Sequence, residues 1–154
     1  MHANGPALFD RLLGTAGHDG PQTLEQLKDA VARDLEDLLN TRSALPEELL
    51  AAWPECAASI VSYGLLDIAG LCLSSSDDRR RICDSLRLAI ERHEPRLRQV
   101  RARVELAPGT VNRINFVITG VLLGPGLQEP INFDAVLQPS TLHYAIRRHH
   151  RQSD

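Results

Sequence analysis

The run ERHEPRLRQVRARVEL, residues 91–106, changes its hydrophobic period halfway along, and this change limits the folds open to the chain. Before it, apolar residues recur with the spacing of a helix. Pro95 disfavours helical geometry at the preceding residue, so the helix is predicted to end at Glu94. After it, apolar and charged residues alternate with the period of a half-buried strand, Val100, Ala102, Val104 and Leu106 against Arg101, Arg103 and Glu105. The chain is therefore expected to pass directly from a helix into a strand.

Two long helices are predicted before this point, at 23–40 and 77–94. Thr23 and Gln26 have the spacing of a capping box, which marks the start of the first helix. Each helix has one apolar face: Leu24, Leu27, Val31, Leu35 and Leu38 in the first, and Ile82, Leu86, Ala89, Ile90 and His93 in the second.

The segment between the two helices has a weaker pattern. Residues 54–64 are predicted to form one short helix closed by Gly64 in a left-handed conformation. Another buried helical turn or two is expected within 65–73. Trp53 and Tyr63 are expected at the core or its rim.

Four strands are predicted after Pro95, at 97–106, 114–122, 131–137 and 142–147, with turns at 107–110 and 138–141 and a loop at 124–130. Helices followed by consecutive strands predict an α+β fold, with the N-terminal helices on one face of a mostly antiparallel C-terminal sheet of three to four strands. The expected organisation is a mobile N-terminal arm (1–22), a single domain (23–148) and a basic tail (149–154).

Composition limits the classes of partner and compartment. Aromatic residues make up 4% of the chain, which argues against a nucleic-acid partner bound by base stacking. The longest apolar run, 60–73, is too short for a membrane span, so no membrane insertion is expected. Three cysteines without Cys-x-x-Cys spacing, and an N-terminus without signal-peptide character, predict a cytoplasmic protein.

Charge is unevenly divided along the chain. Residues 1–78 carry 4 Lys+Arg and 13 Asp+Glu, whereas residues 79–154 carry 13 and 7. The division indicates an acidic helical part beside a basic sheet. It is compatible with oriented docking as well as with plain solvation of both parts.

Glu94 is the first candidate for chemistry, as an acid at a helix end. Glycoside hydrolysis needs a second carboxylate roughly 5–9.5 Å away. Asp67, Asp84 and Glu105 are conceivable mates, but their spacing singles out none of them. The favoured role for Glu94 is pairing with a positive group or capping backbone amides. No catalytic residue and no cofactor site is predicted. No metal site is predicted either, because His149 and His150 would point apart on regular structure.

Glu94, Pro95 and Arg96 are predicted to form a partner-binding site together with Arg98, Arg101 and Arg103, a ladder on one side of an exposed sheet. Charges fixed at a rigid junction suit a partner that must arrive in one register, and arginine can hold carboxylates bidentately. The alternative is that Pro95 only terminates the helix and its flanking charges are solvated.

The chain resembles a known family, the TssE subunit of the type VI secretion baseplate, which is kin to the lysozyme-like wedge protein of contractile phage tails. The resemblance lies in LFDRLL (8–13), RDLEDLLNTR (33–42), SIVSYGLLDIAGL (59–71), RRRICDSLRLAIERHEPRL (79–97) and INFDAVLQPST (131–141). The Glu-Pro-Arg tripeptide at 94–96 is the family's hallmark. Leu66 departs from the pattern, because the family often has proline there.

The resemblance implies a structural subunit and not an enzyme. Its partners would be the baseplate subunits TssF, TssG and TssK and the sheath proteins TssB and TssC, at a baseplate docked on the inner membrane. Glu94, Pro95 and Arg96 would fix the contact with the wedge's helical bundle. A free strand edge, either 97–106 or 142–147, would receive an incoming strand. A peptidoglycan hydrolase and a generic adaptor domain remain the alternatives.

Overall fold

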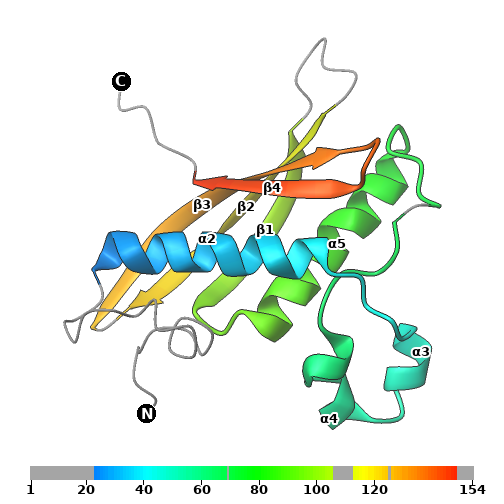
Figure 1. The fold of residues 1–154 in the computed structure, drawn as a ribbon, viewed down its shortest axis with the longest axis horizontal. Helices are drawn as coiled ribbons and strands as arrows, with labels where there is room; N and C mark the ends of the chain where they lie inside the picture. The colour runs from blue at the N-terminus through cyan, green and yellow to red at the C-terminus, as the bar shows by residue number, and fades with distance from the viewer. Residues whose placement is uncertain (1–22, 69, 106–112, 125, 149–154) are drawn as a thin grey trace.

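Two long helices lie against one face of a four-stranded sheet (Figure 1). The computed structural model describes residues 23–68, 70–105, 113–124 and 126–148. The long helices are α2 (Leu24–Asn40) and α5 (Ser76–His93), and the strands are β1 (Leu97–Glu105), β2 (Ile114–Gly124), β3 (Leu127–Gln138) and β4 (His143–Arg148). Each strand pairs antiparallel with the next, in the order β1-β2-β3-β4. The predicted α+β fold is confirmed.

Three predicted segments, the arm at 1–22, the turn at 107–110 and the tail at 149–154, lie outside the described residues. Within the described ranges, no helix has the length and apolar character needed to cross a bilayer.

Both long helices begin where their sequences indicate. The Thr23 hydroxyl accepts a hydrogen bond from the Gln26 amide (3.2 Å), and the Gln26 side chain accepts one from the Thr23 amide (2.9 Å). This capping box satisfies two amide groups that have no partner inside α2. At the start of α5, the Ser75 hydroxyl accepts from the Asp78 amide (3.4 Å).

The core lies between these helices and the covered face of the sheet. The apolar residues predicted for the faces of the two helices and for the first strand belong to one buried cluster, except for Leu24, Ala102 and Val104, which are partly buried against it, and Leu106, which lies outside the described residues. His93 is half-buried, with its ring 5.3 Å from that of Tyr63. The periodicity of the sequence therefore identified the core face of both long helices and of the first strand correctly.

The prediction of a single helix at 54–64 is wrong. The chain forms α3 (Glu47–Leu50), α4 (Pro54–Ala57) and a 3₁₀ turn, η1 (Ile60–Ser62). The helix is interrupted at Ser59, whose backbone is extended and whose hydroxyl instead accepts from the Val61 amide (3.2 Å). Trp53 does not reach the core, because it is 68% exposed.

Gly64 supports a close approach between segments instead of ending a helix. Its φ is +113°, and a Cβ at this position would lie 2.5 Å from the Thr41 carbonyl oxygen. The contact brings Leu65 beside Arg42 in an isolated parallel bridge, with hydrogen bonds of 2.8 Å from Leu65 N to Thr41 O and from Ser43 N to Leu65 O. The helical turns predicted within 65–73 are absent from its described residues, 65–68 and 70–73.

The predicted loop at 124–130 is mostly strand. β2 extends to Gly124, which pairs with Leu127, and Pro130 pairs with Val121 inside the ladder. Proline is tolerated in a strand where its missing N–H faces an edge. That condition holds here because β4 pairs with β3 only from Phe133 onward.

Tyr144 provides a test of the core. It is fully buried, and its hydroxyl is the one buried side-chain polar atom without a hydrogen-bond partner among the described residues. A buried polar group without a partner costs about 1–3 kcal/mol. We therefore expect Tyr144→Phe to raise the free energy of unfolding by about 1 kcal/mol, measured by urea denaturation at neutral pH. A loss of stability would show that the hydroxyl has a partner.

The same substitution has a signature at high pH. Burial raises the pKa of Tyr144 to about 12 from the ordinary 10.0. Between these values only the unfolded chain releases this proton, so the tyrosine's contribution to stability is intact below pH 10 and falls as the pH rises. The advantage of Tyr144→Phe should therefore widen from pH 10 to pH 12, by about 2–3 kcal/mol.

Candidate functional site

The junction between α5 and β1 is a tight turn with defined backbone contacts. Glu94 caps α5, with its amide donating to the Ile90 carbonyl (2.8 Å), and its own carbonyl accepts from the Leu97 amide (3.2 Å). The carbonyl of Arg96 accepts from the Leu123 amide on β2 (2.8 Å). Pro95, exposed between them, ends the helix as predicted.

A charge cluster holds this junction. The Arg96 guanidinium donates through Nε to Glu94 Oε1 (2.7 Å) and through Nη2 to Glu94 Oε2 (2.5 Å). The same Nη2 donates to Asp34 on α2, and the Arg96 amide donates to Glu94 Oε1 (3.1 Å). Glu94 is only 4% exposed. The cluster, defined as Glu94, Arg96 and Asp34, therefore ties both long helices to the first strand.

The electrostatics of the cluster favour its charged form. Burial alone would lower the pKa of Arg96, but the hydrogen bonds and charges of Glu94 and Asp34 outweigh burial and raise this pKa above its usual value. The interpretation that Glu94 pairs with a positive group and caps an amide is confirmed, because it does both. The alternative of two merely solvated charges does not hold for Glu94, which is buried.

Arg98, Arg101 and Arg103 are brought to one face by a β-bulge. In the register, Arg98 pairs with Val121 and Arg101 with Thr119, so three steps along β1 match two along β2. The extra residue is Gln99, with φ +53°. Strict alternation would place Arg98 on the opposite face from Arg101. With the bulge, all three arginines point away from the helices, and all three are exposed. We call them the arginine ladder.

The edge at β4 is closed by side chains of α2, which lies alongside it (Figure 1). The Asn40 amide group donates to the Tyr144 carbonyl and accepts from the Tyr144 amide, both at 2.8 Å. Glu36 accepts from the Ile146 amide (2.8 Å). Every second residue of an edge strand points its main-chain groups outward, and here those of Tyr144 and the Ile146 amide already have partners on α2.

The edge at β1 has a different character. Successive residues of a strand direct their main-chain groups to alternate sides. Because the main-chain groups of Tyr144 point outward from β4, the register across the sheet places those of Arg101 and Arg103 toward β2 and those of Ala102 and Val104 outward. Among the described residues, no side chain forms a hydrogen bond with the outward main-chain groups of Ala102, and Val104 has the Cys83 thiol of α5 nearby. Of the two candidate edges, the β1 edge is therefore the one whose main-chain groups have fewer partners within the described residues.

Sequence reasoning missed the α2 residues that complete this region. Asp34, Glu36 and Asn40 were not singled out, because they are polar positions on an ordinary amphipathic helix. Their one local signal is the i, i+4 spacing of Glu36 and Asn40, which places both on one side of α2.

No group of three or more His, Cys, Asp or Glu side chains suited to a metal ion occurs in the described part of the chain. A hollow of about 40 Å³ lies between α5 and the segment 43–66. Its lining is mainly leucine and serine, and Arg92 is its one charged side chain. This hollow does not include Glu94, so it does not provide a cleft for an acid pair.

The comparison with protein families identifies a family whose match includes this region. A family described as Baseplate wedge protein gp25 matches residues 25–125, from the first turn of α2 to just beyond β2, including the charge cluster and the arginine ladder. No curated protein matches the chain. The matched family is one of structural baseplate components and not a known enzyme family, and its members' role implies contacts with other baseplate components. The resemblance identified from the sequence is thus confirmed, and the chain belongs to the gp25 family of baseplate wedge proteins.

Proposed function

We propose that this chain is the TssE subunit of a type VI secretion baseplate, joining TssF and TssG in the wedge, near TssK, and nucleating the TssB/TssC sheath. Membership of the baseplate wedge family supports the structural part of this proposal. The secretion-system part rests on the resemblance around Glu94-Pro95-Arg96. The protein would then work in the cytoplasm, at a baseplate docked on the inner membrane.

The observation that carries the sheath role is the asymmetry of the two sheet edges. An incoming strand needs unpaired main-chain donors and acceptors along one edge. At β4 the Tyr144 and Ile146 amides are already bonded to α2, whereas at β1 the main-chain groups of Ala102 face outward. The proposal therefore assigns strand addition to β1.

The charge cluster and the arginine ladder have separate roles in this proposal. Glu94 acts through Arg96, because it is buried and both of its oxygens are bonded to that side chain. The cluster fixes the angle between α5 and β1. Pro95 and the ladder are the exposed parts, so they would make the contact with the wedge's helical bundle.

The hydrolase alternative gains no support from the site. A glycosidase acid must present a carboxyl group to the sugar across a cleft. Both oxygens of Glu94 instead accept hydrogen bonds from Arg96, and the carboxylate brought to it is Asp34, not Asp67, Asp84 or Glu105. The geometry is that of a structural ion cluster.

A pull-down from cells expressing the neighbouring baseplate proteins tests the wedge role. Glu94→Ala and Arg96→Ala should lose TssF and TssG, but each also removes a member of the charge cluster that holds the junction. The sharper variant is Arg98→Glu/Arg101→Glu, because both side chains are exposed and form no hydrogen bond or ion pair with other described residues. If the ladder contacts carboxylates of the wedge proteins, the two new glutamates would face groups of the same charge. The amount of TssF and TssG recovered should then fall about tenfold.

The matched control is Arg80→Glu/Arg81→Glu, the same charge change at two exposed positions on α5. It should recover the wedge proteins as the wild type does. If the wild-type protein recovered no baseplate or sheath subunit, the generic adaptor would be favoured. If the wild-type protein cleared cell-wall substrate and the Glu94→Gln variant did not, the hydrolase alternative would be favoured.

A further inference from the structure

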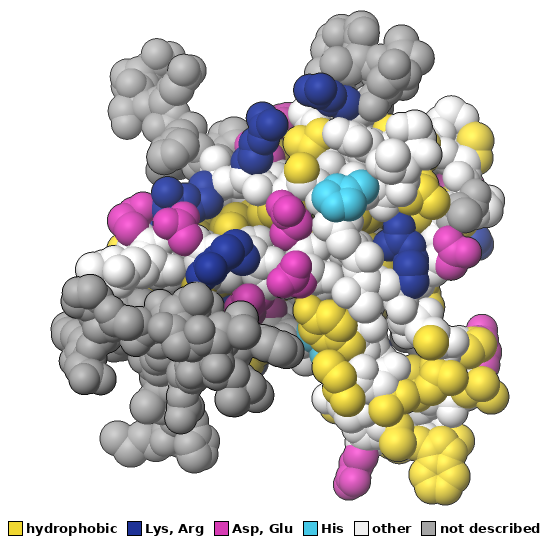
Figure 2. Space-filling model, viewed as in Figure 1, with side chains coloured by type: hydrophobic (Ala, Val, Ile, Leu, Met, Phe, Trp, Pro, Cys, Tyr) yellow, Lys and Arg dark blue, Asp and Glu magenta, His cyan; other side chains and the backbone are white. Residues whose placement is uncertain are grey.

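The large exposed hydrophobic side chains concentrate in one segment, around α3, α4 and η1. Figure 2 shows hydrophobic side chains gathered over α3 and α4, below the helices that cover the sheet. We call the following set the apolar patch: Leu49 (61% exposed), Trp53 (68%), Ile60 (78%), Val61 (45%), Leu66 (42%) and, from α5, Leu88 (39%). Contiguous patches of this kind on soluble proteins mark interaction sites, and exposed tryptophan is a frequent anchor in them.

The segment that carries the patch is firmly attached to α5. Ser62 is buried, and its hydroxyl donates to the Ala57 carbonyl (2.7 Å) and lies 3.2 Å from His93 Nε2 on α5. The Tyr63 ring meets the His93 ring edge-on. The part of the patch around Ile60 and Val61 is therefore held against α5, and a surface positioned before binding lowers the entropic cost of binding.

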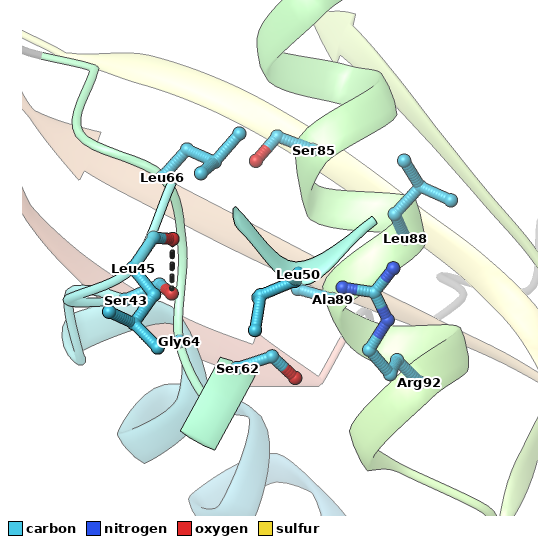
Figure 3. Close-up of a pocket in the computed structure, with 10 residues that line it drawn as sticks. All are labelled: Ser43, Leu45, Leu50, Ser62, Gly64, Leu66, Ser85, Leu88, Ala89 and Arg92. Carbon is cyan, nitrogen blue, oxygen red and sulfur yellow. Dashed lines mark hydrogen bonds between the residues drawn. The ribbon is translucent and has the colours of Figure 1, made fainter. Parts of the chain in front are cut away.

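The hollow at the patch accepts one small apolar group. Leu50 lies at its centre, with Leu66 from the 43–66 segment and Leu88 from α5 on opposite sides (Figure 3). Its volume of about 40 Å³ fits the end of a single aliphatic side chain and nothing of substrate size. A knob from a partner's apolar face would fill it.

Charge restricts the partner further. Residues 43–68 contain four acids, Glu47, Glu48, Glu55 and Asp67, and no Lys, Arg or His. Glu48 and Glu55 are exposed beside Leu49 and Pro54. On the α5 side the rim of the hollow carries Arg92. The surface is thus apolar with an acidic border on the side of α3 and α4.

We propose that the apolar patch docks an amphipathic helix of another protein, with an apolar face that places one aliphatic side chain in the hollow and with Lys or Arg beside Glu48 and Glu55. A helix fits because the residues of the patch lie on short helical turns, on the side of α5 and in an irregular segment, and none of them belongs to a strand. This inference goes beyond the proposed function, since it uses none of the residues of the β1 edge, the charge cluster or the arginine ladder.

Trp53 is the single tryptophan of the chain, so its fluorescence reports directly on the patch. The probes are two synthetic amphipathic helices of about 18 residues, one of Leu and Lys and the other of Leu and Glu. The Lys peptide should shift Trp53 emission to the blue, protect it from acrylamide quenching and bind more weakly in high salt. The Glu peptide should bind at least about tenfold more weakly.

Matched variants distinguish binding at the patch from nonspecific hydrophobic binding. Leu66→Ser should weaken binding of the Lys peptide about tenfold, whereas Leu127→Ser should leave it within about twofold. These two leucines are equally exposed, each at 42%, but Leu127 lies on β3 outside the patch. Circular dichroism shows whether both variants are folded. Glu48→Lys/Glu55→Lys should shift the preference toward the Glu peptide.

Four results would overturn the inference. One is that neither peptide shifts Trp53 emission. Another is that Leu66→Ser and Leu127→Ser weaken binding of the Lys peptide equally. A blue shift that appears with protein concentration alone and is lost in Leu66→Ser would assign the patch to a second copy of the chain. Trp53 inaccessible to acrylamide at every protein concentration would show that the chain covers the patch itself. Because the probes are free peptides, none of these results depends on the baseplate proposal.

Discussion

Arg96→Ala is expected to lower the free energy of unfolding by about 3–5 kcal/mol, measured by urea denaturation. The substitution leaves Glu94 buried, with both of its side-chain partners on the guanidinium removed. It also releases Asp34, so the link between α2 and the junction is lost. Because small domains are stable by only about 5–15 kcal/mol, this single change should remove a large share of the total.

Two further substitutions serve as controls for that result. Arg98→Ala, two residues along, removes the same side-chain type from an exposed position and should change stability by no more than about 0.5 kcal/mol. Arg96→Lys keeps the charge but cannot reproduce the paired contacts made by Nε and Nη2, so its loss should be intermediate. If Arg96→Ala proved no more harmful than Arg98→Ala, the charge cluster would not be what holds the junction.

Binding experiments at this site need the same stability controls. A loss of partner binding in Arg96→Ala could arise from a shifted junction as well as from a missing contact. The arginine ladder is free of this ambiguity, because Arg98, Arg101 and Arg103 are exposed and point away from the core.

The parts of the fold that the sequence predicted are those encoded by local spacing. The capping box at Thr23, the apolar faces of the two long helices and the alternation after Pro95 each involve residues a few positions apart. Such patterns depend on the geometry of one element, so they survive whatever the rest of the chain does. They were sufficient for the α+β fold class.

The parts that it could not predict depend on contacts distant along the chain. Asp34 meets Arg96 across 62 positions, and Asn40 meets Tyr144 across 104. Nothing near Asn40 distinguishes a residue that seals a strand edge from a solvated one. The bulge at Gln99 is equally hidden, because a glutamine with positive φ breaks the usual preference for glycine at such a position. Without that bulge, alternation places Arg98 on the wrong face.

The segment 54–73 shows the opposite failure, where local signals were read correctly but were overridden. Pro54 does begin a helix, and Gly64 does have positive φ. However, Leu65 and Ile68 are buried, and the main chain at Leu65 bonds to the segment after α2. Tertiary pairing thus took the hydrogen bonds that a local helix would have used. It also left Trp53 on the surface, in the apolar patch.

Ala102→Pro should abolish sheath nucleation if β1 receives the incoming strand as proposed. The Ala102 amide points away from β2, so proline removes a donor that the protein's own sheet does not use. An added strand would lose this bond and meet the proline ring. We expect few or no TssB/TssC sheaths in cells, counted by fluorescence microscopy, while the variant remains folded and still recovers TssF and TssG.

The control for this substitution is Ala102→Val, which keeps the amide and suits a strand, so sheaths should form as in the wild type. The comparison isolates the main-chain donor from the side chain, because both variants enlarge the residue at the same position. Wild-type sheath numbers in Ala102→Pro would contradict strand addition at β1. Because the amides of Tyr144 and Ile146 at the β4 edge are already bonded to Asn40 and Glu36, sheath assembly would then have to rely on side-chain contacts.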